Sequence, residues 1–397
     1  MNTKVRNNMN NMKGFYLLTF FGVGSISPLL SVYMSEVNEF SGYQIGMIMS
    51  IGPIMMIFFQ PIWGMVSDWL NAPVKVLTIT TLVAGIISLG YLYFQTYLGF
   101  LVIAVLVALF QSAIIPISDS ISLAYCSKVK VNYGSIRLYG SLGFGMAVFI
   151  MGRLSEINES VIFYSFCLAL TVASILATKL PQEKTNEARN THLLSGIKEM
   201  LSYKKFLLFL VITFMIFGPN LGNNVYFGLL VEHLGGSYTG IGMAFLIAVL
   251  SEIPFMRLAS HLVRRFGILP IVVVAGMVSL GRWFLYFTEP NIGVIYASAF
   301  LQGASVGLFI PAGLQYVRGI TPTHLTATAI TLYSAIGNGL GNWFCTYIGG
   351  IIFDHYFINI VYLFFSLMAF VGVILVLCLM KIDKHEQTGN VQLPQNR

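Results

Sequence analysis

Residues 98–125 read LGFLVIAVLVALFQSAIIPISDSISLAY, an apolar stretch in which Asp119 is the only charged side chain. A helix rises 1.5 Å per residue, so about 20 apolar residues cover the roughly 30 Å hydrocarbon core of a bilayer. The stretch is continuous rather than alternating, which argues against a strand of a membrane barrel. It therefore predicts a membrane-spanning helix that carries an acid.

Similar stretches recur along the 397 residues. Apolar residues make up 56% of the chain and charged residues 9%, and the mean hydropathy is +0.79, which leaves too little polar surface for a soluble globule. We predict an all-α membrane protein with twelve transmembrane helices in two pseudo-symmetric six-helix bundles. The predicted spans are 14–34, 43–66, 74–94, 98–125, 134–154, 159–179, 205–231, 239–262, 267–287, 291–316, 326–351 and 356–380.

The basic residues gather on one side of this predicted topology. If the first span starts in the cytoplasm, all of the 22 Lys and Arg residues except Arg137, Arg153 and Arg282 fall in cytoplasmic tails and loops. This positive-inside pattern predicts a multi-pass protein of the cell membrane with both termini cytoplasmic. The net charge of +7 then reflects topology and contact with anionic lipid rather than with nucleic acid.

A polar segment divides the predicted spans into six and six. Residues 180–204 are expected to form a cytoplasmic linker between an N-terminal six-helix bundle, residues 1–179, and a C-terminal six-helix bundle, residues 205–380. Residues 381–397 are expected to form a cytoplasmic tail.

The two halves also resemble each other, at an offset of roughly 190 residues. Tyr139 begins the segment YGSLGFG and Tyr333 begins YSAIGNG, while ALFQSA at residues 108–113 recurs as AFLQGA at residues 299–304. The shared offset indicates an internal repeat, which is common in secondary transporters.

Four charged residues within the predicted spans are the most informative: Asp119, Arg137, Glu252 and Arg282. A charge at the bilayer centre costs roughly 2.5–3.5 kcal/mol even on insertion scales, so such residues usually serve a function. Two acids and two bases predict a polar cavity that handles a solute. Two other interpretations stay open: Arg137 lies close enough to a loop to extend to the interface as an anchor, and the acids could form purely structural ion pairs.

The chain resembles the major facilitator superfamily over essentially its full length. Gly64-Met-Val-Ser-Asp68 is similar to that superfamily's G-x-x-x-D-R/K motif, although Trp69 stands where a base is usual. The resemblance implies that Asp68 helps to gate the cytoplasmic side. A solvated loop is the alternative reading of this segment.

Within the superfamily, the chain resembles the lactose permease and phenylpropionate permease group, and more distantly the nucleoside–proton symporters. Asp119, Arg137 and Phe144 fall on the sugar-binding acid, arginine and tryptophan of the lactose permeases, and Glu252 and Arg282 match charged residues of the eighth and ninth spans. Gln302 and Ser305 replace the essential histidine and the proton-carrying glutamate, and Phe144 replaces the tryptophan. The resemblance therefore implies a related solute site without galactoside specificity.

A second polar group lies in the seventh predicted span, GPNLGNNVYFG, which contains Asn220, Asn223 and Asn224. These amides could bind a polar solute or bridge neighbouring helices. We include Asn223 and Asn224 among the substrate-binding residues, with Asp119, Arg137, Phe144 and Arg282.

The predicted function is secondary active transport by alternating access, with proton-coupled uptake of a small polar organic solute such as a sugar or a nucleoside. An exporter of the same fold and an uncoupled facilitator are the alternatives. The chain lacks the paired mid-span aspartates of an intramembrane protease and the filter motif of a channel, so we do not expect an enzyme. We expect no metal or cofactor and a functional monomer in the bilayer.

Coupling is expected to depend on the two mid-span acids, because Gln302 and Ser305 cannot carry a proton. Glu252 is the preferred carrier, with Arg282 displacing its proton when the two approach. Asp119 is the second candidate, and we expect it to stay ionised for the solute.

Overall fold

The computed structural model describes residues 3–182, 198–322 and 325–391, and every regular element within these residues is a helix. The N-terminal helices are α1 (Thr3–Ile26), α2 (Leu30–Glu36), α3 (Gly42–Leu70), α4 (Pro73–Ser88), α5 (Gly90–Tyr93), α6 (Tyr97–Val129), α7 (Gly134–Ser155) and α8 (Val161–Ala177). The C-terminal helices are α10 (Lys204–His233), α11 (Tyr238–Phe266), α12 (Ile268–Phe287), α13 (Ile292–Ile320), α14 (Thr326–Ser334), the π-helical segment η2 (Ala335–Gly341), α15 (Asn342–His355) and α16 (Ile358–Val391).

Each of the twelve predicted spans corresponds to a helix or a line of consecutive helices. Ten of these, within the described residues, are long and apolar enough to cross a membrane by themselves. The other two are α8, which is shorter, and the line of α14, η2 and α15, which the π-helical segment interrupts. The predicted all-α, twelve-helix fold is confirmed.

Local sequence explains where several helices begin and end. Pro28 separates α1 from α2, because proline has no N–H to continue the helical ladder. Ser41 begins α3 with a capping box, in which its side chain and that of Gln44 each accept a backbone N–H of the other residue. Asn71 ends α3 in the left-handed conformation, with φ 49°, and Pro73 then occupies the first turn of α4.

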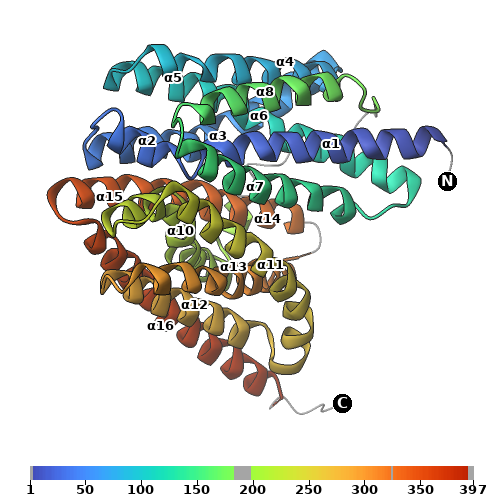
Figure 1. The fold of residues 1–397 in the computed structure, drawn as a ribbon. Helices are drawn as coiled ribbons and strands as arrows, with labels where there is room; N and C mark the ends of the chain where they lie inside the picture. The colour runs from blue at the N-terminus through green and yellow to red at the C-terminus, as the bar shows by residue number, and fades with distance from the viewer. Residues whose placement is uncertain (1–2, 183–197, 323–324, 392–397) are drawn as a thin grey trace.

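The helices form two bundles that lie against each other (Figure 1). Helices α1 to α8 form one bundle and α10 to α16 the other, and they meet where α3 packs on α15 and α7 packs on α11. The start of α1 and the end of α16 lie at the same end of the molecule, which we call the terminal end. We call the opposite end the far end.

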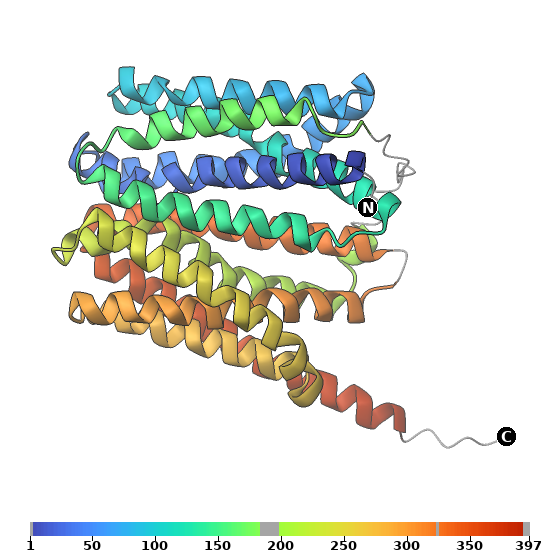
Figure 2. The ribbon, with the colours of Figure 1, turned by 45° about the vertical axis from the view of Figure 1, so that its right-hand side comes forward.

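The two bundles touch closely at the far end. A Cβ added to Gly46 of α3 would come within 2.6 Å of the Gly350 Cα on α15, and one added to Gly152 of α7 would come within 3.1 Å of the Gly242 Cα on α11. Only glycine permits such backbone contact. At the terminal end, α11 and α16 slant away from the N-terminal bundle (Figure 2).

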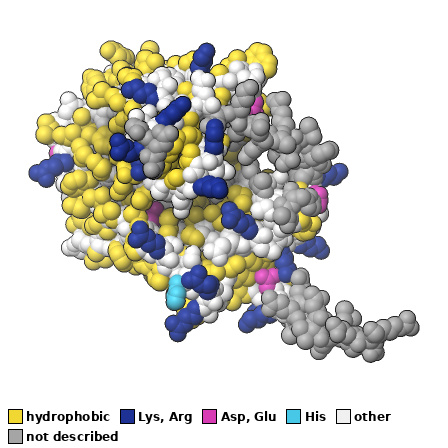
Figure 3. Space-filling view, turned by 90° about the vertical axis from the view of Figure 1, so that its right-hand side faces the viewer, with side chains coloured by type: hydrophobic (Ala, Val, Ile, Leu, Met, Phe, Trp, Pro, Cys, Tyr) yellow, Lys and Arg dark blue, Asp and Glu magenta, His cyan; other side chains and the backbone are white. Residues whose placement is uncertain are grey.

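The terminal end is also the basic end of the molecule. Figure 3 looks onto it and shows Lys and Arg side chains spread across the ends of both bundles. Within the described part of the chain, Lys and Arg side chains therefore gather on this face.

Candidate functional site

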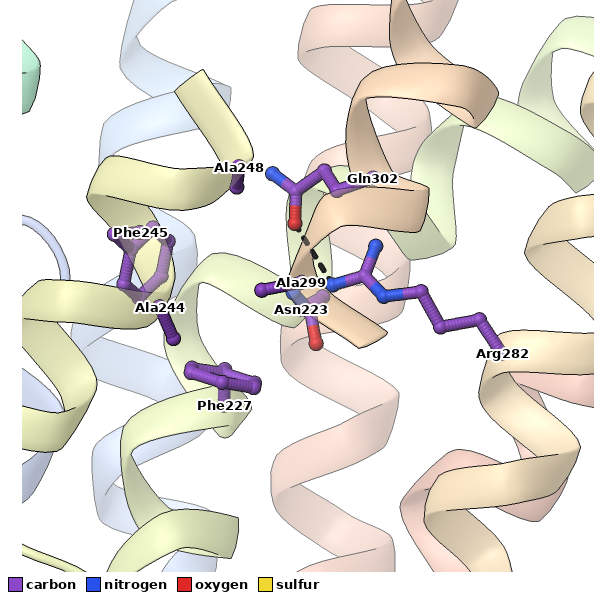
Figure 4. Close-up of a pocket in the computed structure, with 8 residues that line it drawn as sticks. All are labelled: Asn223, Phe227, Ala244, Phe245, Ala248, Arg282, Ala299 and Gln302. Atoms are coloured by element: carbon purple, nitrogen blue, oxygen red, sulfur yellow. Dashed lines mark hydrogen bonds between the residues drawn. The ribbon is translucent and has the colours of Figure 1, made fainter. Parts of the chain in front are cut away.

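A narrow crevice inside the C-terminal bundle contains the buried arginine. It lies between α10, α11, α12 and α13, and we call it the charged crevice (Figure 4). Arg282 is only 2% exposed, so its charge depends on protein partners. The lining residues are Asn223, Phe227, Ala244, Phe245, Ala248, Arg282, Ala299 and Gln302.

Polar and aromatic neighbours hold the Arg282 guanidinium in place. Its Nε donates to the Tyr286 hydroxyl at 3.0 Å and its Nη2 donates to Gln302 Oε1 at 2.8 Å. It also lies over the rings of Trp283 and Tyr286, with 4.7 and 5.3 Å to the centroids. The charge is thus stabilised by dipoles and aromatic faces rather than by a bonded carboxylate.

Two buried donors in the charged crevice lack a protein acceptor among the described residues. They are Nη1 of Arg282 and Nδ2 of Asn223, whose Oδ1 already accepts from the Tyr362 hydroxyl at 3.1 Å. An unpaired buried donor costs about 1–3 kcal/mol, so such groups are usually paired. These two donors lie in one crevice that has no room for a water molecule in this conformation, so they can bind the oxygen atoms of a solute only after the crevice widens.

A second layer of hydrogen bonds ties α10, α12 and α13 together beside the crevice. Asn220 donates to the Ser279 hydroxyl at 3.1 Å and accepts from the Ser305 hydroxyl at 3.3 Å. Ser298 donates to the Tyr286 hydroxyl at 2.9 Å. Asn220 therefore bridges helices, which is one of the two roles that the sequence left open for the asparagines.

Asn224 faces a different space, a cavity of about 340 Å³ between the two bundles that we call the central cavity. It is bordered by α1, α3, α6 and α10 and by the first residue of α15. Asn223 and Asn224 are consecutive residues of α10, and they line two separate pockets.

Asp119 is bound by tyrosines rather than by arginine. It accepts the hydroxyls of Tyr16 at 2.5 Å and Tyr133 at 2.7 Å. Burial, and then the nearby Asp119 carboxylate, raise the pKa of Tyr133, which lies in the turn before α7. Both phenols therefore donate to the same carboxylate oxygen, Oδ1.

Arg137 lies beside this cluster without an ion pair to Asp119 among the described residues. Its guanidinium stacks over Phe20 at 4.1 Å and lies 5.8 Å from the Tyr16 ring centroid. Asp119, Arg137 and Phe144 line neither the charged crevice nor the central cavity. Phe144 lies on α7, where its backbone packs against Gly24 of α1. The six predicted substrate-binding residues are therefore not brought together in one pocket in this conformation.

Glu252 lies half-buried on α11, packed against α13. A Cβ added to Gly303 would come within 2.7 Å of the Glu252 backbone nitrogen, and one added to Gly307 within 3.0 Å of its carbonyl oxygen. The positive charge of Arg282 acts on the Glu252 carboxyl. The predicted carrier and the predicted base are therefore electrostatic neighbours, without a salt bridge in the described part of the chain.

Asp68 lies exposed at the last turn of α3, at the terminal end. Its carbonyl accepts the N–H of Asn71 at 3.1 Å, which closes the helix. No ion pair of its carboxylate is found within residues 3–182, 198–322 and 325–391.

Sequence reasoning missed several residues that the structure places in these regions. Tyr286 and Gln302 hold Arg282, Tyr16 and Tyr133 hold Asp119, and Gln111 borders the central cavity. From the sequence, Gln302 is recognisable only as a residue that replaces a histidine. An amide inside an apolar span is the signal that identified the asparagines of α10. The same signal in the span 98–125 would have identified Gln111.

Two helical bundles that cross the membrane, with a charged crevice inside one and a cavity between them, define a solute transporter. The chain belongs to the MFS_1 like family, whose sequence model matches residues 9–365. The predicted membership of the major facilitator superfamily is confirmed, and the chain is a secondary transporter of the permease type.

Several known proteins are similar over nearly the full length. The uncharacterized transporter YwbF of Bacillus subtilis (strain 168) is 50% identical over 390 residues, which cover 98% of this chain and 97% of that one. The maltose permease of Geobacillus stearothermophilus is 45% identical over 371 residues, covering 93% and 94%. The solved structure of the nucleoside transporter NupG matches with a TM-score of 0.85 at 17% identity, covering 96% of this chain and 100% of that one, and it supports the fold alone.

Proposed function

We propose that this transporter takes up an uncharged sugar, with maltose as the leading candidate, together with protons. The observation that carries the proposal is the pair of unpaired donors, Arg282 Nη1 and Asn223 Nδ2, in the charged crevice. Sugar hydroxyls are acceptors for both donors, and the rings of Phe227 and Phe245 offer apolar faces for sugar C–H groups. The similarity to a maltose permease supports the same solute class.

Proton coupling is proposed to run through Glu252. This carboxyl is half-buried on α11, beside α13, and the charge of Arg282 acts on it. A movement that brings Arg282 closer favours release of the proton, and one that separates them favours uptake. Asp119, bound by two phenols, is the second candidate for coupling.

The direction of opening follows from the placement of the basic residues. We infer that the terminal end faces the cytoplasm of a cell membrane, because Lys and Arg crowd that face. With the far end closed by glycine contacts, we propose that this conformation is an inward-facing state and that the protein functions as a monomer. Asp68 is proposed to pair with a base when the terminal end closes.

Binding to the purified protein tests the solute class. Maltose, xanthosine and phenylpropionate are added separately to detergent-solubilised protein, and the midpoint of thermal unfolding is recorded. We expect maltose alone to raise the midpoint, since only a ligand that binds the folded state stabilises it. Stabilisation by xanthosine or phenylpropionate and not by maltose would overturn the sugar assignment.

A further inference from the structure

The central cavity has no charged side chain among its lining residues. Its walls are mainly aliphatic, as at Ile48, Met49 and Val107, and its volume of about 340 Å³ lies at the lower end of the range of about 300–1,000 Å³ for small-molecule sites. Removing a charge from water without a partner is costly, so a charged group is disfavoured here. The cavity suits an uncharged part of a solute.

Three amide side chains from three elements border this cavity. They are Gln111 of α6, Asn224 of α10 and Asn342 at the start of α15, and we call them the amide triad. Gln111 and Asn224 have no hydrogen-bond partner in the described part of the chain. Asn342 accepts the Thr346 hydroxyl at 3.2 Å through Oδ1, which leaves its Nδ2 as a donor. All three are half-buried.

We propose that the amide triad determines solute specificity by binding neighbouring hydroxyl groups of the sugar. Each primary amide offers both a donor and an acceptor, so it can accept from one hydroxyl and donate to the next. The apolar walls cover the C–H face of the same ring. This inference rests on the proposed sugar transport and assigns a second contact region beyond the charged crevice.

The location of the triad gives it a further consequence. Gln111 belongs to the N-terminal bundle, whereas Asn224 and Asn342 belong to the C-terminal bundle. A sugar held by all three links the two halves, so its affinity depends on how the halves are placed. Solute binding and alternating access are then coupled through the same three side chains.

The test measures uptake of labelled maltose by protein reconstituted in liposomes, with Gln111→Leu, Asn342→Leu and Gln111→Glu compared with the unaltered chain. Each variant is expected to raise KM about 10-fold with Vmax retained, because one net hydrogen bond to the bound sugar is lost. Gln111→Glu keeps the size of the side chain but replaces the amide with a carboxyl group, which either brings a charge into the cavity or must stay protonated. Gln60→Leu, which removes an amide of α3 outside both pockets, is the matched control and should leave KM unchanged.

The outcomes separate the two proposals. If the unaltered protein transports maltose and the three variants keep its KM, the amide triad is not a specificity determinant and sugar transport still stands. A fall in Vmax at constant KM would likewise contradict the proposal for the amide triad, because it would indicate that these side chains have a structural role. If the unaltered protein transports xanthosine and not maltose, the sugar proposal itself fails.

Discussion

At the scale of single residues, the proposed site depends most on Arg282. Its planar guanidinium is already bound on two edges by Tyr286 and Gln302, and its third nitrogen is free for the solute. Lysine has a single ammonium group, which cannot donate to Tyr286, Gln302 and the solute in the three directions that the guanidinium covers. The arrangement therefore requires arginine and not merely a positive charge.

Arg282→Lys is expected to raise the KM for maltose by about 10- to 100-fold, because hydrogen bonds to a buried charged group are worth about 1.5–3 kcal/mol. Initial rates in proteoliposomes measure the effect. Arg257→Lys on the exposed part of α11 is the control and should leave KM unaltered. Normal maltose uptake by Arg282→Lys would place the solute outside the charged crevice.

Glu252→Gln tests the proton carrier. The amide cannot release a proton, so the variant is expected to lose accumulation of maltose against its gradient while it still exchanges labelled for unlabelled maltose. Efflux, exchange and gradient-driven uptake are compared in the same vesicles. If the variant still concentrates maltose in a pH-dependent way, Glu252 is not the carrier.

The sequence identified the charged residues because charge inside an apolar span is visible without a structure. It could not identify their partners, since these come from distant parts of the chain. Tyr16 lies 103 positions from the Asp119 that it binds. Gln302 illustrates the same limit, because a neutral amide attracts notice only once Arg282 is seen beside it.

At the scale of helices, two helix starts at the far end are bound by carboxylates of the opposite bundle. Glu156, just after α7, accepts the Thr239 N–H of α11 at 2.9 Å. Asp354, near the end of α15, accepts the Tyr43 N–H of α3 at 3.3 Å. Anions at helix N-termini are favourable, so this reciprocal pair helps to keep the far end closed.

The closure should consequently weaken in acid. Hydrogen bonds from the Ser41 side chain and the Tyr43 backbone N–H lower the pKa of Asp354, which lies beyond the predicted span 326–351. This lowered pKa stabilises the closed state fully above the ordinary pKa of the carboxyl, and the stabilisation is lost as the pH falls below that value and through the lowered pKa. Low pH at the far end therefore favours opening of that end.

Asp354→Asn with Glu156→Gln is expected to increase the population with an open far end at neutral pH. Distances between spin labels at Glu39 and Tyr356, in a background without native cysteines, measure this population. Glu289→Gln is the control, since Glu289 pairs with His233 within one bundle at 3.2 Å. An unchanged distance distribution in the double variant would show that the caps do not hold the closure.

The helices themselves were largely predictable, because the length of an apolar stretch fixes a span. Their interruptions were less so. The span 326–351 is divided into α14, η2 and α15, where Gly337, Gly339 and Gly341 pack against neighbouring helices. Such packing depends on tertiary contacts that a pattern of apolar residues does not encode.

At the scale of the whole molecule, the placement of charge and the two-bundle fold together predict the topology. Reporters fused after Tyr203 and at the C-terminus should both give a cytoplasmic signal, because the positive-inside pattern assigns both segments to the cytoplasm. A fusion to alkaline phosphatase reports an external position, and a fusion to green fluorescent protein reports a cytoplasmic one. An external signal from either position would contradict the assignment of the closed far end to the outside of the cell.

The claim that joins all three scales is proton-coupled uptake of a sugar, and transport by the purified protein tests it most directly. The protein is reconstituted in liposomes, an inward proton gradient is imposed, and the internal concentration of labelled maltose is followed with and without an uncoupler. We expect accumulation above the external concentration, which collapses to equilibrium with the uncoupler. The absence of maltose uptake, or uptake that stops at equilibrium and ignores the gradient, would contradict the account.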